Sequence, residues 1–234
     1  MAVLAGGVLQ SATGFGFSML TAPLLLALLG PEQAVTASSL LGFMLSGVLL
    51  AGEGRRPVIA THDAAVLVAC SLPGLALGAI AVSTFSVQVL ALVMATGVFA
   101  GLVVRVRSRR SPPREVGSWS APLAGLAAGA LSTSTGISGP PLIFHLLARG
   151  LPPARMRDTL AAVFLSLGAI GLIPLAITGS LDIPDGMPLL LAFALVGQVA
   201  GRRVFARMSS GAYEPVVLGV LLLASTAALV SAFL

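Results

Sequence analysis

The sequence predicts an all-α integral membrane protein with two inverted repeats, each a broken-helix hairpin plus three transmembrane helices. Three observations lead to this fold class: a very apolar composition, a polar break near the start of each half, and arginines confined to four short loops. Of the 234 residues, 57% are hydrophobic and 9% are charged, and the mean hydropathy is +1.04. Charged residues make up about a quarter of a typical soluble domain. We therefore expect the chain to lie in a lipid bilayer.

Ten apolar segments are predicted to be helices. Several approach the ~20 residues that a helix needs to cross the hydrocarbon layer, and the ~10-residue alternating segments of barrel strands are absent. In each half, two short segments precede three longer ones. The first half has Met1–Ala12, Phe17–Leu29, Glu32–Ala51, Ala64–Ser83 and Val87–Val104. The second half has Trp119–Leu131, Pro140–Leu147, Ala154–Thr178, Gly186–Gly201 and Ala212–Leu234.

The two halves are related by an internal duplication. Adding 122 to a residue number places Leu9 on Leu131, Thr13 on Thr135, Gly14 on Gly136, and Pro31 on Pro153. Adding 123 places Gly74 and Gly78 on Gly197 and Gly201, a spacing of small residues that lets helices pack closely. We expect one domain over residues 1–234, with repeat 1 at 1–104, a cytoplasmic linker at 105–118, and repeat 2 at 119–234.

The arginines predict how the repeats cross the membrane. All 13 basic residues are arginines in four short loops between apolar segments, and cytoplasmic loops of membrane proteins collect positive charge. All four loops are cytoplasmic only if each pair of short helices enters and leaves the membrane on the same side. The turn at Gly30-Pro31 is then outside and the equivalent turn at Pro152-Pro153 is inside. Inverted halves that each carry a broken helix are typical of secondary transporters.

The two breaks are the candidate substrate-binding site. Backbone that leaves the helix within a membrane is tolerated where it lines a cavity or is buried in protein. Each break ends at a helix N-terminus, whose N–H groups and positive dipole end suit an anion. We expect a small oxyanion to bind between the two breaks without a charged partner, because no Lys or Arg falls within the predicted core. The candidate residues are Gln10, Ser11, Thr13, Gly14, Gly16, Ser18, Ser132, Thr133, Ser134, Thr135, Gly136, Ser138 and Gly139.

His145 completes this candidate set. It lies within the second arm of the second hairpin, and an ionisable residue in a membrane is a functional candidate. The two interpretations left open are a proton carrier or ligand donor, and a neutral histidine that donates to a backbone carbonyl. Gln198 is expected to form an interhelical hydrogen bond, Asp158 to pair with a neighbouring arginine, and Asp63 to cap a helix. Small polar residues that only help helices to pack are the alternative explanation for the breaks.

Several other functions are excluded. Cys70 is the only cysteine, so neither an internal disulfide nor a cysteine metal cluster is possible. The net charge of +5 comes from arginines at the predicted membrane boundaries, so nucleic acid is not an expected partner. The sequence contains no P-loop or Rossmann motif and no credible triad or metal site, so we expect no enzyme activity and no cofactor.

Glycine-rich breaks that are each followed by proline and a helix resemble the TauE/SafE family of sulfite exporter-like permeases. The matching stretches are Gly7–Pro23 with Leu29–Ser39, and Gly129–Pro141 with Leu151–Leu160. The resemblance implies a multi-pass carrier of the bacterial inner membrane for sulfite, sulfonates or related small organic anions. By carry-over, five residues would line the substrate path: Gly14, Gly16, Gly136, Ser138 and Gly139.

Two rival functions remain open at this point: an anion channel built from the same hairpins, and a membrane scaffold subunit that transports nothing. The sequence also leaves open proton or sodium coupling, a homodimer, the direction of transport and the choice between sulfite, sulfonate and carboxylate anions.

Overall fold

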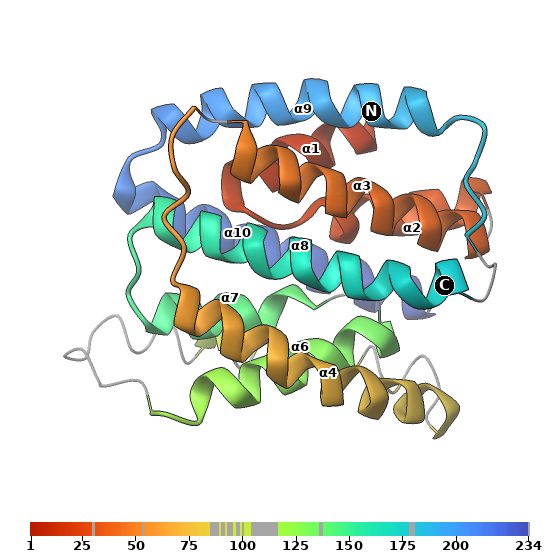
Figure 1. The fold of residues 1–234 in the computed structure, drawn as a ribbon, viewed down its shortest axis with the longest axis horizontal. Coiled ribbons are helices and arrows are strands. Elements are labelled where there is room, and N and C mark those ends of the chain that lie inside the picture. The colour runs from red at the N-terminus through yellow and green to blue at the C-terminus, as the bar shows by residue number, and fades with distance from the viewer. Residues whose placement is uncertain are drawn as a thin grey trace. The chain divides into compact units, whose positions relative to one another are not determined.

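The computed structural model describes residues 1–29, 31–52, 54–84, 89, 92, 96, 99, 101–103, 117–135, 138–177 and 181–233. Over these ranges the chain forms nine α-helices and no strand (Figure 1). Chain contacts divide it into two compact units, the first with residues 1–60 and 153–213, the second with residues 61–152 and 214–234. Each unit therefore combines helices from both halves of the sequence.

The first unit holds five helices: α1 (Ala2–Thr13), α2 (Phe17–Leu29), α3 (Pro31–Ala51), α8 (Pro153–Ile177) and α9 (Met187–Arg207). The second unit holds α4 (Thr61–Thr84), α6 (Ser120–Thr135), α7 (Gly139–Ala148) and most of α10 (Ser210–Phe233).

The predicted helices are confirmed wherever the structure describes them. Phe17–Leu29 has the predicted bounds, whereas α9 continues beyond its predicted end at Gly201 to Arg207. The predicted helix Val87–Val104 and the linker at 105–118 lie largely outside the described residues. Among the described residues, three helices are long and apolar enough to cross a membrane: Thr61–Ala81, Pro153–Ile173 and Met187–Arg207.

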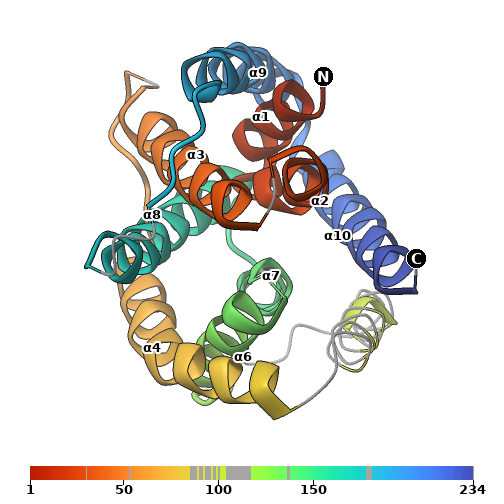
Figure 2. The ribbon, with the colours of Figure 1, turned by 90° about the vertical axis from the view of Figure 1, so that its right-hand side faces the viewer.

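Helices α1 and α9 lie side by side (Figure 2), and they pack in parallel through glycines that bring their backbones together. A Cβ added at Gly197 would overlap the carbonyl oxygen of Leu4, and one at Gly201 would overlap that of Val8. On the other side of the contact, a Cβ at Gly7 would overlap the carbonyl oxygen of Ala194. Only glycine fits such a close approach, and small residues at the interface are what membrane helices use to associate.

Helices α4 and α6 repeat this packing within the second unit (Figure 2). A Cβ at Gly74 would overlap the carbonyl oxygen of Leu126, and one at Gly129 would overlap that of Ser71. The residue pairs match those of α1 and α9 under the offsets seen in the sequence, since Leu4 corresponds to Leu126 and Gly197 to Gly74. The predicted glycine pairs therefore have equivalent contacts in the two units.

Helices α3 and α8 pack in an antiparallel direction. Near the middle of the pair, Gly47 of α3 faces Leu165, while the earlier residue Phe43 faces the later residue Gly168. Beyond the end of α3, Arg55 reaches Asp158 in the second turn of α8. These three contacts, which pair later residues of the first segment with earlier residues of α8, show that the two helices run in opposite directions.

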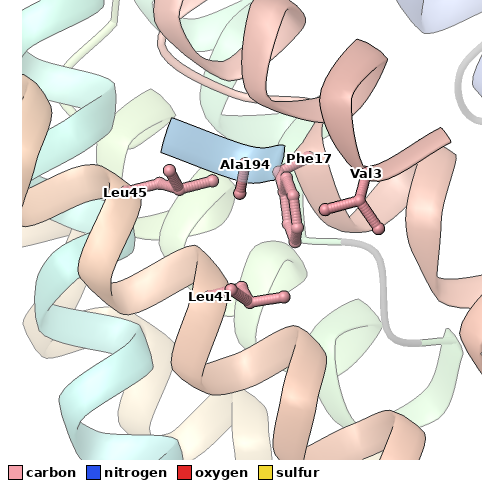
Figure 3. Packing of buried hydrophobic residues seen from close by; sticks show 5 residues of the cluster. All are labelled: Val3, Phe17, Leu41, Leu45 and Ala194. Atoms are coloured by element: carbon pink, nitrogen blue, oxygen red, sulfur yellow. The ribbon is translucent and has the colours of Figure 1, made fainter. Parts of the chain in front are cut away.

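The core of the first unit lies where α1, α2, α3 and α9 meet. Figure 3 shows five buried side chains there that point toward one another: Val3, Phe17, Leu41, Leu45 and Ala194. Phe17 is the first residue of α2, so its burial fixes where the chain resumes a helix after the first break.

Replacing Gly197 with alanine is expected to lower the stability of the protein by about 1–3 kcal/mol, because the new methyl group overlaps the α1 backbone. The matched control is Gly171→Ala in α8, where an added Cβ meets nothing within 4 Å. That change is expected to stabilise its helix by up to about 1 kcal/mol. Thermal unfolding of the detergent-solubilised variants measures both changes, and equal effects would contradict the close packing of α1 on α9.

Candidate functional site

The first break is a tight, ordered turn between α1 and α2. Gly14 ends α1 with a φ of 88°, and its N–H donates to the carbonyl of Gln10 at 2.8 Å. Gly16 has a φ of 100°. L side chains rarely adopt this left-handed conformation, so both positions favour glycine. The predicted interruption between Ala12 and Phe17 is therefore confirmed as a backbone feature.

Two of the polar side chains at this break hold the turn together. The amide of Gln10 donates to the hydroxyl of Ser46 at 3.1 Å, and its oxygen accepts from the N–H of Phe17 at 3.4 Å. The hydroxyl of Thr13 donates to the carbonyl of Leu9 at 2.8 Å, with the carbonyl oxygen of Phe15 2.9 Å away. These bonds satisfy Gln10 and Thr13 within the protein and give the turn its shape.

Ser11 differs from these neighbours. Its side chain is fully buried, and its hydroxyl has no hydrogen-bond partner in the described part of the chain. Buried hydroxyls are usually hydrogen-bonded, since an unpaired one costs about 1–3 kcal/mol. Ser18, in the first turn of α2, is half-buried. Ser11 is thus the hydroxyl at this break that is free to donate to a ligand.

A buried arginine lies directly against the first break. Arg157 of α8 is fully buried, and its Nε donates to the carbonyl oxygen of Ser11. The guanidinium carbon also lies 4.2 Å from the centre of the Phe205 ring, a cation–π distance. The expectation that the core contains no arginine is therefore wrong. Arg157 fell inside the predicted helix Ala154–Thr178 but was counted among the arginines of a cytoplasmic loop, whereas α8 buries it within the protein.

Tyr213 closes the same cluster and was also missed from the sequence. Its hydroxyl donates to the carbonyl oxygen of Thr13 at 2.7 Å, and its ring packs edge-on against Phe205 with 6.0 Å between centroids. The sequence offered one signal, since this is the only tyrosine of the chain and buried tyrosine hydroxyls usually find a partner. The C-terminal end of α1 is thus held from α8, α9 and α10.

Asp158, next to Arg157, is an ionic anchor between α8 and the segment after α3. Arg55 approaches both carboxylate oxygens, at 2.7 and 2.9 Å, and the N–H of Val58 donates at 2.8 Å. Asp158 thus pairs with an arginine, but the prediction of a neighbouring arginine is wrong, because Arg55 lies about 100 residues away in the sequence. Gln198 makes the expected interhelical bond, donating to the carbonyl of Leu45 at 2.8 Å.

The second break is described only in part. Ser132 and Thr133 lie in the last turn of α6, and the hydroxyl of Thr133 donates across to the carbonyl of Leu75 in α4 at 2.9 Å. Gly136 lies outside the described residues, as do the side chains of Ser134 and Thr135. Ser138 precedes α7 and makes no side-chain cap bond. Gly139 begins α7, and prolines occupy its first turn. The two breaks belong to different units, so their shared role in binding stays a prediction.

His145 is buried near the end of α7, and its environment does not match the neutral structural histidine considered above. Among the described residues, neither ring nitrogen has a hydrogen-bond partner, so the ring does not donate to a backbone carbonyl. Asp63, in the first turn of α4, is the nearest acidic group. No group of three potential metal ligands occurs within the described parts of the chain.

Comparison with protein families explains this combination of helices and breaks. The family model described as sulfite exporter TauE/SafE matches residues 1–228. The chain belongs to the TauE/SafE family. The resemblance inferred from the two glycine-rich breaks is thereby confirmed. Comparisons with curated proteins and with solved structures gave no match.

Membership in the TauE/SafE family makes this chain a membrane protein of a transporter family, in agreement with its long apolar helices. A transporter needs a polar site within an apolar body. In the first unit, the turn between α1 and α2 brings polar groups together: Arg157 donates to the carbonyl oxygen of Ser11, and α2 begins at Phe17 just after the turn.

Replacing Asp158 with asparagine is expected to destabilise this TauE/SafE protein by about 1–3 kcal/mol. Breaking a fully buried ion pair costs about 3–5 kcal/mol, but the side chain of Arg55 is 37% exposed, and water offsets part of the loss. Thermal unfolding measures the change. Asp182→Asn, at an exposed loop position, is the control and should leave the midpoint unchanged. An unchanged midpoint for both variants would contradict the anchoring role.

Proposed function

We propose that this TauE/SafE protein is a secondary transporter of small sulfur oxyanions, such as sulfite or sulfonates, in the bacterial inner membrane. Transport proceeds by alternating access between two inverted repeats. The family and the apolar helices support a transporter in a membrane. The proposal that the substrate is an anion rests on one observation: Arg157 is buried and donates to the backbone at the turn of a broken helix.

The packing of α3 on α8 supports the inverted repeats. These helices occupy equivalent places in the two halves, because adding 122 to Phe43 gives Leu165. They run antiparallel, with Phe43 against Gly168 and Gly47 against Leu165. Two equivalent helices that pack side by side in opposite directions are expected when one repeat is upside down relative to the other.

The chemistry of the first break suits an oxyanion. A guanidinium offers several N–H donors in a fixed plane, which match the oxygens of sulfite or a sulfonate. The buried hydroxyl of Ser11 adds a donor, and the N-terminus of α2 adds N–H groups and a positive dipole end. A hydrogen bond to a charged group contributes about 1.5–3 kcal/mol. Two or three such bonds give about 3–9 kcal/mol, which spans the range of millimolar to micromolar affinity.

Ser11→Ala is the sharpest test of this site. Because the hydroxyl makes no hydrogen bond within the protein, we expect its loss to leave the unliganded thermal midpoint unchanged. The affinity for sulfite should fall about 10- to 100-fold, since one bond to a charged group is lost. Uptake of radiolabelled sulfite into proteoliposomes measures the affinity. Thr36→Val removes another buried hydroxyl without a partner in the same unit and should leave uptake unchanged.

Arg157→Gln is expected to abolish the stabilisation of the protein by sulfite. A ligand at 100 times its dissociation constant stabilises a protein by about 2.7 kcal/mol, and the effect disappears with binding. Arg157→Lys keeps the charge but not the planar fork and should retain a weakened shift. Arg203→Gln on the exposed face of α9 is the control. A sulfite-dependent shift that persists in folded Arg157→Gln would exclude this arginine from the site.

A further inference from the structure

Three ionisable side chains meet in the second unit, where α4 begins and α7 ends. Asp63 accepts from Nε of Arg149 at 3.2 Å, and its other carboxylate oxygen lies 3.9 Å from Nε2 of His145. The side chains of His145 and Asp63 are 3% and 8% exposed, whereas that of Arg149 is 46% exposed. A nearly buried carboxylate is thus shared between a buried imidazole and a guanidinium that reaches water.

The distance between His145 and Asp63 would allow a second arrangement, in which the imidazole is hydrogen-bonded to the carboxylate. At 3.9 Å the imidazole and the carboxylate do not form a hydrogen bond. A movement of about 1 Å would bring them to the 2.7–2.9 Å of a charge-assisted bond. Because neither ring nitrogen is hydrogen-bonded within the described chain, that movement would break no existing bond of the ring.

Protonation of His145 is the event that would favour the second arrangement. An imidazolium gains attraction to Asp63, and it lies in the last turn of α7, where the negative end of the helix dipole stabilises a cation. Arg149 opposes this change, because it is positive and already binds the same carboxylate. Asp63 therefore pairs with Arg149 when His145 is neutral, and is drawn toward His145 when the imidazole is protonated.

The other neighbours of His145 do not alter this conclusion. Helix α6, which packs against α7, contains no titratable residue. Gly101 contacts the adjacent Phe144, and the described residues 101–103 there are Gly, Leu and Val. His62 lies beside Asp63 at 4.0 Å, but its side chain is 90% exposed and faces solvent.

We propose that His145 binds the proton that couples anion movement to a pH gradient, with Asp63 as its counter-ion. This inference rests on the proposed transport function. Water on one side of the membrane gives a proton to a ring nitrogen, forming the imidazolium, and water on the other side takes it back. No bond of the anion is made or broken.

The position of this pair explains how protonation would affect transport. Helix α7 is the second arm of the hairpin whose first arm, α6, packs closely on α4 at Gly74 and Gly129. The contact between His145 and Asp63 joins α7 to the same α4. Protonation of His145 therefore changes how strongly α7 is held to α4, while α6, the other arm of the hairpin, stays packed on α4.

The experiment uses the full-length protein in proteoliposomes with radiolabelled sulfite. Two initial rates are measured: exchange at equal pH on both sides, and uptake with the outside more acidic by ~1 pH unit. Such a gradient supplies a driving force of up to about tenfold for each proton moved. Sulfite itself titrates near neutral pH, but it does so identically for every variant.

In the wild-type protein, gradient-driven uptake is expected to exceed exchange several-fold. In His145→Gln the ratio of the two rates should fall several-fold, to the value that the titration of sulfite alone produces, whereas His62→Gln, the same change at the exposed neighbour, should keep the wild-type ratio. A wild-type ratio in His145→Gln would overturn the proposal. A wild-type protein that exchanges sulfite but ignores the gradient would also overturn it. A wild-type protein without any sulfite exchange would instead refute the proposed function.

Arg149→Gln provides a second test. If His145 had only a structural role, this change would not shift the pH dependence of exchange. Removing this positive charge frees Asp63 for the imidazolium, so the pH dependence of exchange should shift to higher pH relative to the wild type. An unshifted profile would overturn the proposal. This result decides the question even if His145→Gln fails to fold, because Arg149 is half-exposed and its loss leaves the α4–α6 packing intact.

Discussion

The close backbone contact between parallel helices is the constraint on which the described structure depends. In lipid, apolar side chains gain little by leaving the solvent, so helices associate through close packing and polar contacts. Here α1 meets α9 and α4 meets α6 at glycines where no Cβ would fit. Each pair joins a helix from the first half of the sequence to one from the second half. Neither half could therefore position its own broken helix without the other.

This packing also explains why an arginine can be buried beside the first break. Taking a charge out of water costs several kcal/mol unless other groups replace its hydration. Helix α8 delivers Arg157 to the C-terminal end of α1, where Ser11 presents a carbonyl oxygen and α9 presents the face of Phe205. The carbonyl end of α1 is itself favourable for a cation. The same break thus offers an acceptor to the arginine, and in the proposed function it also offers donors to an anion.

The sequence predicted the helices well, because their determinants are local. Helix α2 has its predicted bounds, since Gly14 and Gly16 interrupt the backbone just before it. The C-terminal end of α9 was harder, because arginine was interpreted as loop. Helix α9 continues through Arg202 and Arg203 to Arg207, whereas α8 lies within one residue of its predicted bounds at both ends.

The site could be predicted only in part. The break residues Ser11 and Gly14 were identified, because glycines and hydroxyls cluster there. The partners of the charged residues were not, because they depend on tertiary contacts. Asp158 pairs with Arg55 about 100 residues earlier, and the environment of His145 depends on Asp63 in another helix. No local pattern contains either pairing.

The charge moved in one cycle connects the two proposals. A monovalent anion that crosses alone moves one charge, which is worth about 2.3 kcal/mol for each 100 mV of membrane potential. A proton carried on His145 in the same step cancels that charge, so transport would respond to the pH gradient and not to the potential. Arg157 does not alter this balance, because it stays with the protein. An arginine at the first break and a histidine in the second unit would then divide the work: the arginine holds the anion, and the histidine sets which gradient drives it.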